Sequence, residues 1–240
     1  MCTLEKRGDL FILTITGDDE QHRLSPSLVD SIRSALAEAQ SKITPGSALI
    51  TTATGKFFSN GFDLAFAQAS GSKSGFIDRM LYQVDYFKPL VADLISFPAP
   101  TIAAVNGHAA AAGLALALSH DYIIMRSDRG VLYMSEVDLG MTLPDYFTTL
   151  FRAKIGSASV RREILLAGRK VKGAEAVKMG IVEAAHDSEE KVVESGVRMG
   201  AEFSKRKWNG EVFGEIRKSL YPELCGVLGL VCKMAVASKL

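Results

Sequence analysis

Short apolar segments alternate with helical patterns up to about residue 135 of the 240-residue chain, and helical patterns dominate after Tyr146. The apolar segments are expected to be β-strands, because they are short, rich in β-branched residues and bounded by turn residues. They cover residues 9–16, 48–52, 101–105, 121–126 and 130–133. Alternation of strands and helices is typical of α/β proteins. The sequence therefore predicts an α/β core followed by a helical C-terminal part.

Three helices are expected within this alternating region. Ser25 and Pro26 indicate a helix start, with serine as the N-cap and proline at the first helical position. A second helix is expected over residues 80–97, and the small apolar run 109–119 is consistent with a buried helix. The polar segment 70–75, with the sequence SGSKSG, is predicted to be mobile.

Composition excludes several classes of protein. An apolar fraction of 48% supports a sizeable core, and a net charge of +1 argues against a nucleic-acid partner. No apolar run approaches the roughly 20 residues of a membrane-spanning helix, and residues 1–10 lack a signal-peptide core, so no membrane insertion is expected. Cys2, Cys225 and Cys232 are too few and too scattered for a disulfide framework or a zinc site.

The chain ends in Ser238, Lys239 and Leu240. A C-terminal S-K-L is an address read by the peroxisomal import receptor. The alternative is a chance ending. We expect a peroxisomal protein that has this receptor as a partner.

Two segments join a strand to a helical stretch through small residues. In residues 56–64, a turn at Gly61 would expose backbone N–H groups that lack partners in the fold. In residues 106–115, alanine and glycine would let another group approach the backbone at a helix N-terminus. The alternatives are an ordinary strand-to-helix turn and tight helix packing.

A third segment, residues 133–140, carries Glu136 among apolar neighbours. Such a carboxylate is either solvated at a strand end or held in an apolar site, where it could act as an acid or base. The sequence leaves both readings open.

Together, the three segments resemble the crotonase superfamily, also called the enoyl-CoA hydratase/isomerase family. The similarity runs from about residue 10 to residue 183 and includes residues 100–107, 121–124 and 174–182. It implies an α/β fold, a spiral of strand-strand-helix units with a helical C-terminal trimerisation region. Residues 1–190 would form the acyl-CoA-binding catalytic core. Residues 191–240 would form the helical region with the targeting tail, in a homotrimer or a dimer of trimers.

The resemblance also implies an oxyanion hole, which stabilises an enolate with two backbone N–H groups. By motif, these groups belong to Phe62 and Ala112, and Glu136 is the catalytic carboxylate. Many relatives carry alanine at the position of Phe62 and two glycines at Ala111 and Ala112, so this pocket has bulkier walls. The implied substrate-binding residues are Ser59, Asn60, Gly61, Phe62, Asp63, Leu64, Ala112 and Gly113.

The family's hydratases use two glutamates, and the second would fall at Ala115. A single glutamate resembles the Δ3,Δ2-enoyl-CoA isomerases, which convert 3-enoyl-CoA to trans-2-enoyl-CoA in the β-oxidation of unsaturated fatty acids, and residues 143–147 also look closer to that subgroup. This reaction needs neither a metal nor a redox cofactor. The alternatives are a hydratase, a dienoyl-CoA isomerase using Asp138 or Asp145, or a non-catalytic acyl-CoA-binding homologue.

Several side chains have more than one interpretation. Asn60, Phe66 and Tyr146 are candidates for shaping the acyl pocket, and His108 either lines it or packs elsewhere. His22, His120 and His186 have no partners at metal-ligand spacing. Lys205, Arg206, Lys207 and Trp208 form a basic cluster that either meets CoA phosphates of a neighbouring subunit or is a solvated helix face.

Overall fold

The computed structural model describes residues 1–17 and 20–236, so the Ser238-Lys239-Leu240 tripeptide lies outside the described residues. Its strands form two sheets, one ordered β1-β2-β3-β5-β7-β10 and the other β4-β6-β8-β9. The strands are β1 (Cys2–Arg7), β2 (Leu10–Ile15), β3 (Ala48–Ala53), β4 (Phe57–Ser59), β5 (Thr101–Val105), β6 (His108–Ala110), β7 (Tyr122–Arg126), β8 (Val131–Tyr133), β9 (Val171–Lys172) and β10 (Ala184–His186). The helices are α1 (Pro26–Ser41), α2 (Leu64–Gln68), α3 (Lys73–Ile95), α4 (Ala112–Leu118), α5 (Asp145–Lys154), α6 (Ala158–Leu165), α7 (Gly173–Lys178), α8 (Glu189–Ser204), α9 (Gly210–Leu220) and α10 (Pro222–Leu228).

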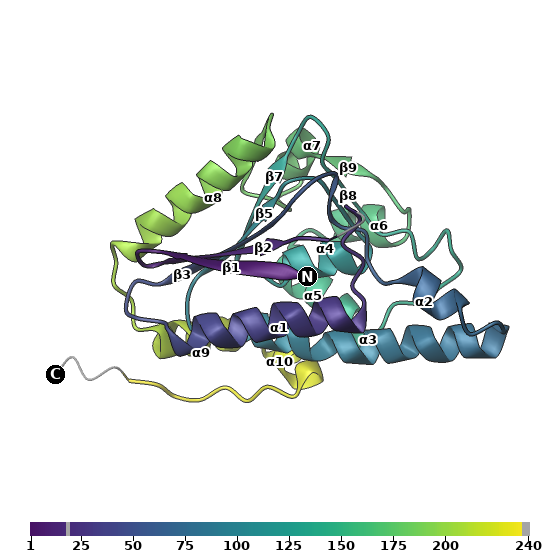
Figure 1. The fold of residues 1–240 in the computed structure, drawn as a ribbon, viewed down its shortest axis with the longest axis horizontal. Helices are drawn as coiled ribbons and strands as arrows, with labels where there is room; N and C mark the ends of the chain where they lie inside the picture. Colours follow the sequence, from purple (N-terminus) through teal and green to yellow (C-terminus); the bar gives the residue numbers. More distant parts are fainter. Residues whose placement is uncertain (18–19, 237–240) are drawn as a thin grey trace.

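The central strands of the larger sheet, β2, β3, β5 and β7, are buried on both faces. All strand pairs of this sheet are parallel except the β1–β2 hairpin. Figure 1 shows α8 on one side of this sheet and α1 and α3 on the other. Along β5, Ala103 and Val105 belong to the main core, whereas Ile102 and Ala104 pack with Val192 of α8. A parallel strand covered on both faces reads as a continuous apolar run, which is why the sequence revealed these strands.

The smaller sheet places the three motif segments side by side. β4, β6 and β8 are parallel neighbours, and each lies a few residues after a strand of the larger sheet. A helix follows each pair of strands, so the strand-strand-helix unit recurs along the chain. Because parallel strands end at the same edge of a sheet, the loops that begin at Asn60, Ala111 and Met134 meet there.

The expected α/β class is confirmed, and the differences are local. The helix expected from residue 80 begins at Lys73, because the Ser72 side chain accepts a hydrogen bond from the Gly75 N–H at 3.1 Å. Part of the segment expected to be mobile is therefore its capped first turn. Residues 109 and 110, expected at the start of a helix, instead belong to strand β6 between β4 and β8. Tertiary pairing overrides weak local propensity in such a short segment.

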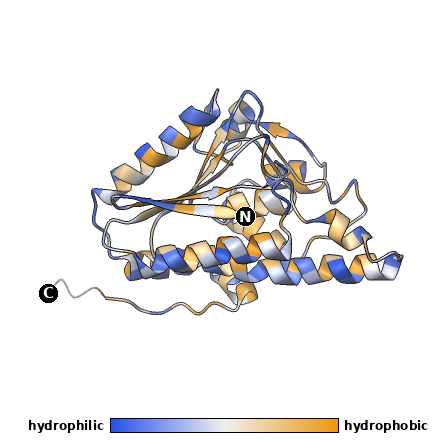
Figure 2. Cartoon of the chain, in the orientation of Figure 1, coloured by the Kyte–Doolittle hydropathy of each residue, from blue (hydrophilic) through white to orange (hydrophobic). Residues whose placement is uncertain are grey.

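Amphipathic helices complete the outer layers. Hydrophilic and hydrophobic residues alternate around α1, α3 and α8, and their apolar sides face the sheet and core (Figure 2). None of the described helices is both long and apolar enough to cross a membrane. The trimerisation role of the C-terminal helices and the division at residue 190 remain predictions.

Candidate active site

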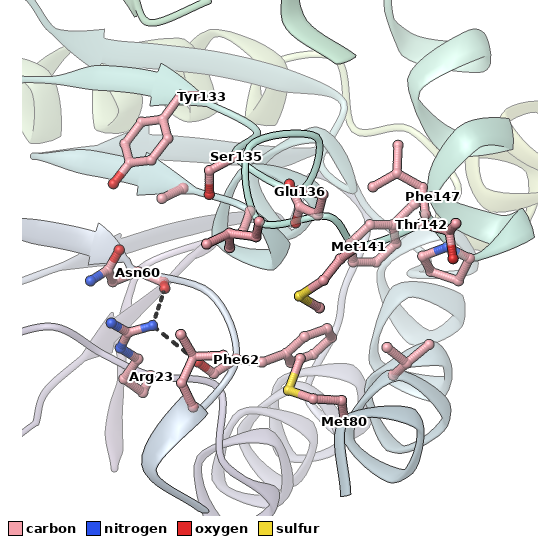
Figure 3. Close-up of a pocket in the computed structure, with 17 residues that line it drawn as sticks. Arg23, Asn60, Phe62, Met80, Tyr133, Ser135, Glu136, Met141, Thr142 and Phe147 are labelled. Atoms are coloured by element: carbon pink, nitrogen blue, oxygen red, sulfur yellow. Dashed lines mark hydrogen bonds between the residues drawn. The ribbon is translucent and has the colours of Figure 1, made fainter. Parts of the chain in front are cut away.

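A pocket opens where the loops after β4, β6 and β8 converge (Figure 3). Its empty volume, including the part open to solvent, is about 740 Å³. It is lined by Arg23, Asn60, Phe62, Leu64, Met80, Val84, Ala110, Ala111, Tyr133, Ser135, Glu136, Leu139, Met141, Thr142, Leu143, Pro144 and Phe147. All three motif segments therefore contribute to one concave site.

The first loop leaves β4 through Gly61, whose φ of +76° is a conformation that side-chain-bearing residues rarely adopt. A Cβ at this position would lie 2.9 Å from the Ala111 Cβ and 3.4 Å from the Ala112 nitrogen. The glycine thus lets the first loop pass directly against the second. This contact brings the backbones of Phe62 and Ala112 close together.

The second loop turns sharply into α4. Ala111 has φ 51° and ψ −126°, a strained geometry for alanine, and its N–H donates to the Tyr133 carbonyl at 2.9 Å. Ala112 begins the helix, so its N–H has no intrahelical acceptor. Gly113 packs on β4 so closely that a Cβ there would lie 2.2 Å from the Ser59 carbonyl oxygen. The small residues of this motif therefore have a steric cause.

Glu136 reaches the pocket from the loop that follows β8. Its carboxylate is half-buried, and Oε2 is buried without a hydrogen-bond partner among the described residues. Burial raises the pKa of Glu136 above its ordinary 4.5, against the opposing effect of the backbone N–H groups of Glu136 and Ser135. A carboxylate with one unpartnered oxygen and a raised pKa is suited to general acid–base chemistry.

Glu136 is the sole carboxylate among the described residues that line this pocket. Ala115, where a second glutamate would fall, is completely buried in α4. The Asp138 carboxylate lies beside Gly168, and Asp145 accepts a hydrogen bond from the Tyr146 N–H at 2.6 Å. Asp63 caps α2 by accepting from the Phe66 N–H at 3.1 Å. The geometry thus offers one acid/base group.

The pocket has a polar end and an apolar end. In Figure 3, Tyr133, Asn60 and Arg23 gather on one side, and Met80, Met141 and Phe147 lie on the other. Phe62 and Glu136 lie between these groups. Phe62 and Phe147 stack with ring centroids 6.3 Å apart. An extended ligand with a polar body and an apolar chain fits such a division.

Not every residue expected in the site lines the pocket. Asn60, Phe62, Leu64 and Glu136 do so. Ser59, Gly61, Asp63, Ala112 and Gly113 instead shape the loops behind the surface. Ser59, for example, is fully buried, and its hydroxyl donates to the His22 carbonyl at 2.8 Å. Their individual roles remain predictions.

Sequence reasoning missed most of the apolar end. Phe66 packs with Tyr82 instead of entering the pocket, and the Tyr146 hydroxyl donates to the Val84 carbonyl at 2.7 Å. The neighbouring Phe147 lines the pocket instead, because successive helical residues point in different directions. Met80 and Val84 come from α3, which no motif marks. The one sequence signal for Met80 and Val84 is their four-residue spacing, which places them on the same face of a helix.

The other candidate side chains lie elsewhere. His108 is half-buried beside Lys56 in a separate, more polar cavity. In the basic cluster, Lys205 pairs with Glu202 at 2.6 Å, and the Arg206 guanidinium lies over the Trp208 ring. No group of three or more His, Cys, Asp or Glu side chains is arranged to hold a metal within the described part of the chain.

The chain is similar to known proteins in sequence and in fold. The model of the enoyl-CoA hydratase/isomerase family matches residues 8–210. The chain is 62% identical to "Enoyl-CoA delta isomerase 2, peroxisomal" of Arabidopsis thaliana, over 100% of both chains. It is 50% identical to "Enoyl-CoA delta isomerase 1, peroxisomal" of the same plant, over 93% of this chain and 91% of the relative. A probable enoyl-CoA hydratase of Mycobacterium tuberculosis shares the fold, with a TM-score of 0.82 and 21% identity over 95% of this chain and 91% of that chain.

Proposed function

The chain belongs to the enoyl-CoA hydratase/isomerase family, and we propose that it is a Δ3,Δ2-enoyl-CoA isomerase acting in fatty-acid β-oxidation. Two relatives at 62% and 50% identity carry the name enoyl-CoA delta isomerase. The observation that carries the proposal is the single carboxylate of the pocket, Glu136, with its unpartnered Oε2. A one-base reaction requires no other acid or base.

The reaction begins when the Glu136 carboxylate removes a C2 proton from a 3-enoyl-CoA. The C–H electron pair forms the C2–C1 double bond of a dienolate, and negative charge moves to the thioester oxygen. The backbone N–H groups of Phe62 and Ala112 donate hydrogen bonds to that oxygen, and one such donor lowers the barrier by roughly 3–4 kcal/mol. The protonated Glu136 then returns the proton at C4, which leaves trans-2-enoyl-CoA. The raised pKa of Glu136 favours the first transfer, because the conjugate base of a weaker acid takes a proton more readily. It also keeps the proton on the carboxyl group until C4 of the dienolate accepts it.

Hydration is the reaction that this site supports least. A hydratase needs a second carboxylate to position water, whereas Ala115 supplies a methyl group inside the core. Asp138 and Asp145, either of which was a candidate for the extra carboxylate of a dienoyl-CoA isomerase, lie outside the pocket lining. A non-catalytic acyl-CoA-binding homologue would not need a half-buried glutamate with an unpartnered oxygen in its pocket.

The test is turnover of 3-enoyl-CoA, followed as the appearance of the conjugated trans-2 product. Substrate deuterated at C2 distinguishes a one-base shuttle from exchange with solvent. We expect part of the deuterium to reappear at C4, because the same carboxyl carries it. Hydration of trans-2-enoyl-CoA at a rate comparable to isomerisation would refute the assignment.

The protein is peroxisomal. Two relatives, at 62% and 50% identity, have the word peroxisomal in their names. We further propose that Ser238, Lys239 and Leu240 bind the import receptor. Deletion of Leu240 should leave the purified enzyme active and the tagged protein in the cytosol. Continued import of the shortened chain would contradict this role.

The assembly is proposed to be a homotrimer or a dimer of trimers. Ile216 and Leu220 of α9 are exposed apolar side chains, which supports a contact through the C-terminal helices. Light scattering on the purified protein measures the subunit number. A monomer at micromolar concentration would exclude both states.

A further inference from the structure

Arg23 lies outside the three motif segments, yet its guanidinium lies at the pocket wall beside the first loop (Figure 3). Nη1 donates to two backbone carbonyls, that of Asn60 at 2.9 Å and that of Phe62 at 3.1 Å. These carbonyls lie on either side of the peptide that carries the Phe62 N–H. No ion pair joins Arg23 to a carboxylate of the described residues.

Donors of two adjacent residues, Arg23 and Leu24, hold three successive carbonyls of the first loop by hydrogen bonds. Besides the two held by Arg23, the Gly61 carbonyl accepts from the Leu24 N–H at 2.8 Å. In a planar trans peptide the C=O and N–H point in opposite directions. The Phe62 N–H must therefore point away from Leu24, from the opposite edge of the same peptide group.

The N–H groups of the residues before and after Phe62 are also held by hydrogen bonds. The Gly61 N–H donates to the Ser59 hydroxyl at 3.3 Å, and the Asp63 N–H donates to the Gln83 side-chain oxygen at 3.0 Å. The Phe62 N–H has no acceptor among the described residues. The hydrogen bonds of the adjacent peptide groups thus fix the direction of the Phe62 N–H, which remains available to a ligand.

We propose that Arg23 is a positioning residue that orients the Phe62 N–H for hydrogen bonding to the developing enolate oxygen. The inference rests on the proposed oxyanion role of Phe62. A preorganised donor stabilises the transition state without reorganisation, so small misorientation is costly. The guanidinium charge also acts on the polar side of the pocket, because burial raises the pKa of Tyr133 and the positive charge of Arg23 opposes that rise.

The decisive variant is Arg23→Met, which keeps much of the side-chain bulk and removes all five N–H donors. Isomerase kcat should fall about 10- to 100-fold with KM nearly unchanged, because the ground state needs this donor less than the transition state does. Arg23→Lys retains a donor and should recover part of the loss. A rise in KM at unchanged kcat would overturn the proposal and identify Arg23 as a contact to the CoA body.

Arg79→Met is the matched control. Arg79 is also half-buried, and its Nη1 donates to the Phe66 carbonyl at 2.8 Å, but it does not line the pocket. This variant should lose a similar bond while keeping wild-type kcat. An equal loss of kcat in both variants, with equally lowered melting temperatures, would reduce Arg23 to a general structural role.

A binding measurement separates this inference from the assigned reaction. Acetoacetyl-CoA ionises to an enolate whose absorbance reports the fraction bound in that form. Arg23→Met should raise the apparent pKa of the bound ligand by about one unit, the equivalent of a tenfold loss of enolate stabilisation. An unshifted pKa would refute the role of Arg23 even in an active isomerase, and a shifted one would uphold it even if the isomerase assignment failed.

Discussion

Arg217 and Asp121 form a buried two-point ion pair that joins α9 to the residue preceding β7. The Arg217 Nε lies 2.6 Å from Asp121 Oδ1, and Nη2 lies 2.6 Å from Oδ2. The remaining donors of Arg217 bind the carbonyls of Phe97 and Ala99 after α3. Burial alone would raise the pKa of Asp121, but the nearby guanidinium lowers it overall. The pair therefore attaches a C-terminal helix to the α/β core.

Breaking this pair should destabilise the protein strongly. Asp121→Asn leaves the Arg217 charge buried without its partner, which costs about 3–5 kcal/mol of unfolding free energy. Urea denaturation measures the loss. Arg152→Met, which removes an exposed pair with Glu223, should cost at most about 1 kcal/mol. Because the folded pKa of Asp121 is lowered, its contribution should persist above its unfolded pKa of about 3.8 and disappear as pH falls through the folded value.

Glu136→Gln removes the carboxylate that we propose as the base and preserves the shape of the side chain. We expect kcat to fall by about a hundredfold or more, while acyl-CoA affinity measured by calorimetry changes little. Asp145→Asn is the control, because that carboxylate lies outside the pocket lining. Near-normal turnover of the glutamine variant would assign the chemistry to another group.

The raised pKa of Glu136 links activity to pH. Catalysis requires the carboxylate, so kcat/KM should decline as pH falls through the raised pKa and level off above it. Stability has the opposite dependence, because the folded state favours the neutral form. Relative to Glu136→Gln, the wild type should lose unfolding free energy as pH rises from 4.5 through the folded pKa. If the difference in unfolding free energy between the two proteins stays constant over this pH range, burial does not shift the pKa of Glu136.

Ala111→Gly should stabilise the protein. Ala111 has φ 51° and ψ −126°, which glycine adopts without strain. Relief of about 1–3 kcal/mol is offset by roughly 0.5–1 kcal/mol of extra chain entropy in the unfolded state. The melting temperature should therefore rise, and turnover should persist because the backbone N–H groups remain. A lower melting temperature would indicate that the Ala111 methyl makes necessary contacts.

The same variant is the proper parent for testing the second oxyanion donor. Proline at Ala112 removes the N–H and suits a first helical position, but it restricts the preceding residue. Ala111→Gly accommodates that restriction. The double variant with Ala112→Pro should lose about a hundredfold or more in kcat relative to Ala111→Gly, whereas Ala112→Gly should not. Circular dichroism confirms folding, and a folded proline variant with the parent's turnover would eliminate this donor.

Strands β2, β3, β5 and β7 of the larger sheet and helix α1 could be predicted because their signals are local. β5 was expected at residues 101–105 and is found there, and Ser25 caps α1 by accepting from the Leu28 N–H at 3.3 Å. The α/β class and the pocket's Glu136 also followed from sequence. β1 and β6 did not, because a short strand exists only when its neighbour is present to pair with it.

By itself, the sequence indicated the family and the isomerase activity and predicted Glu136 as the base, because motifs encode which groups are available. Only the tertiary structure decided which groups surround that glutamate. Met80 and Phe147 enter the pocket from helices that no motif marks, and Arg23 meets the Asn60 carbonyl across 37 residues of chain. Such contacts depend on how separate elements pack together, which local residue patterns do not specify.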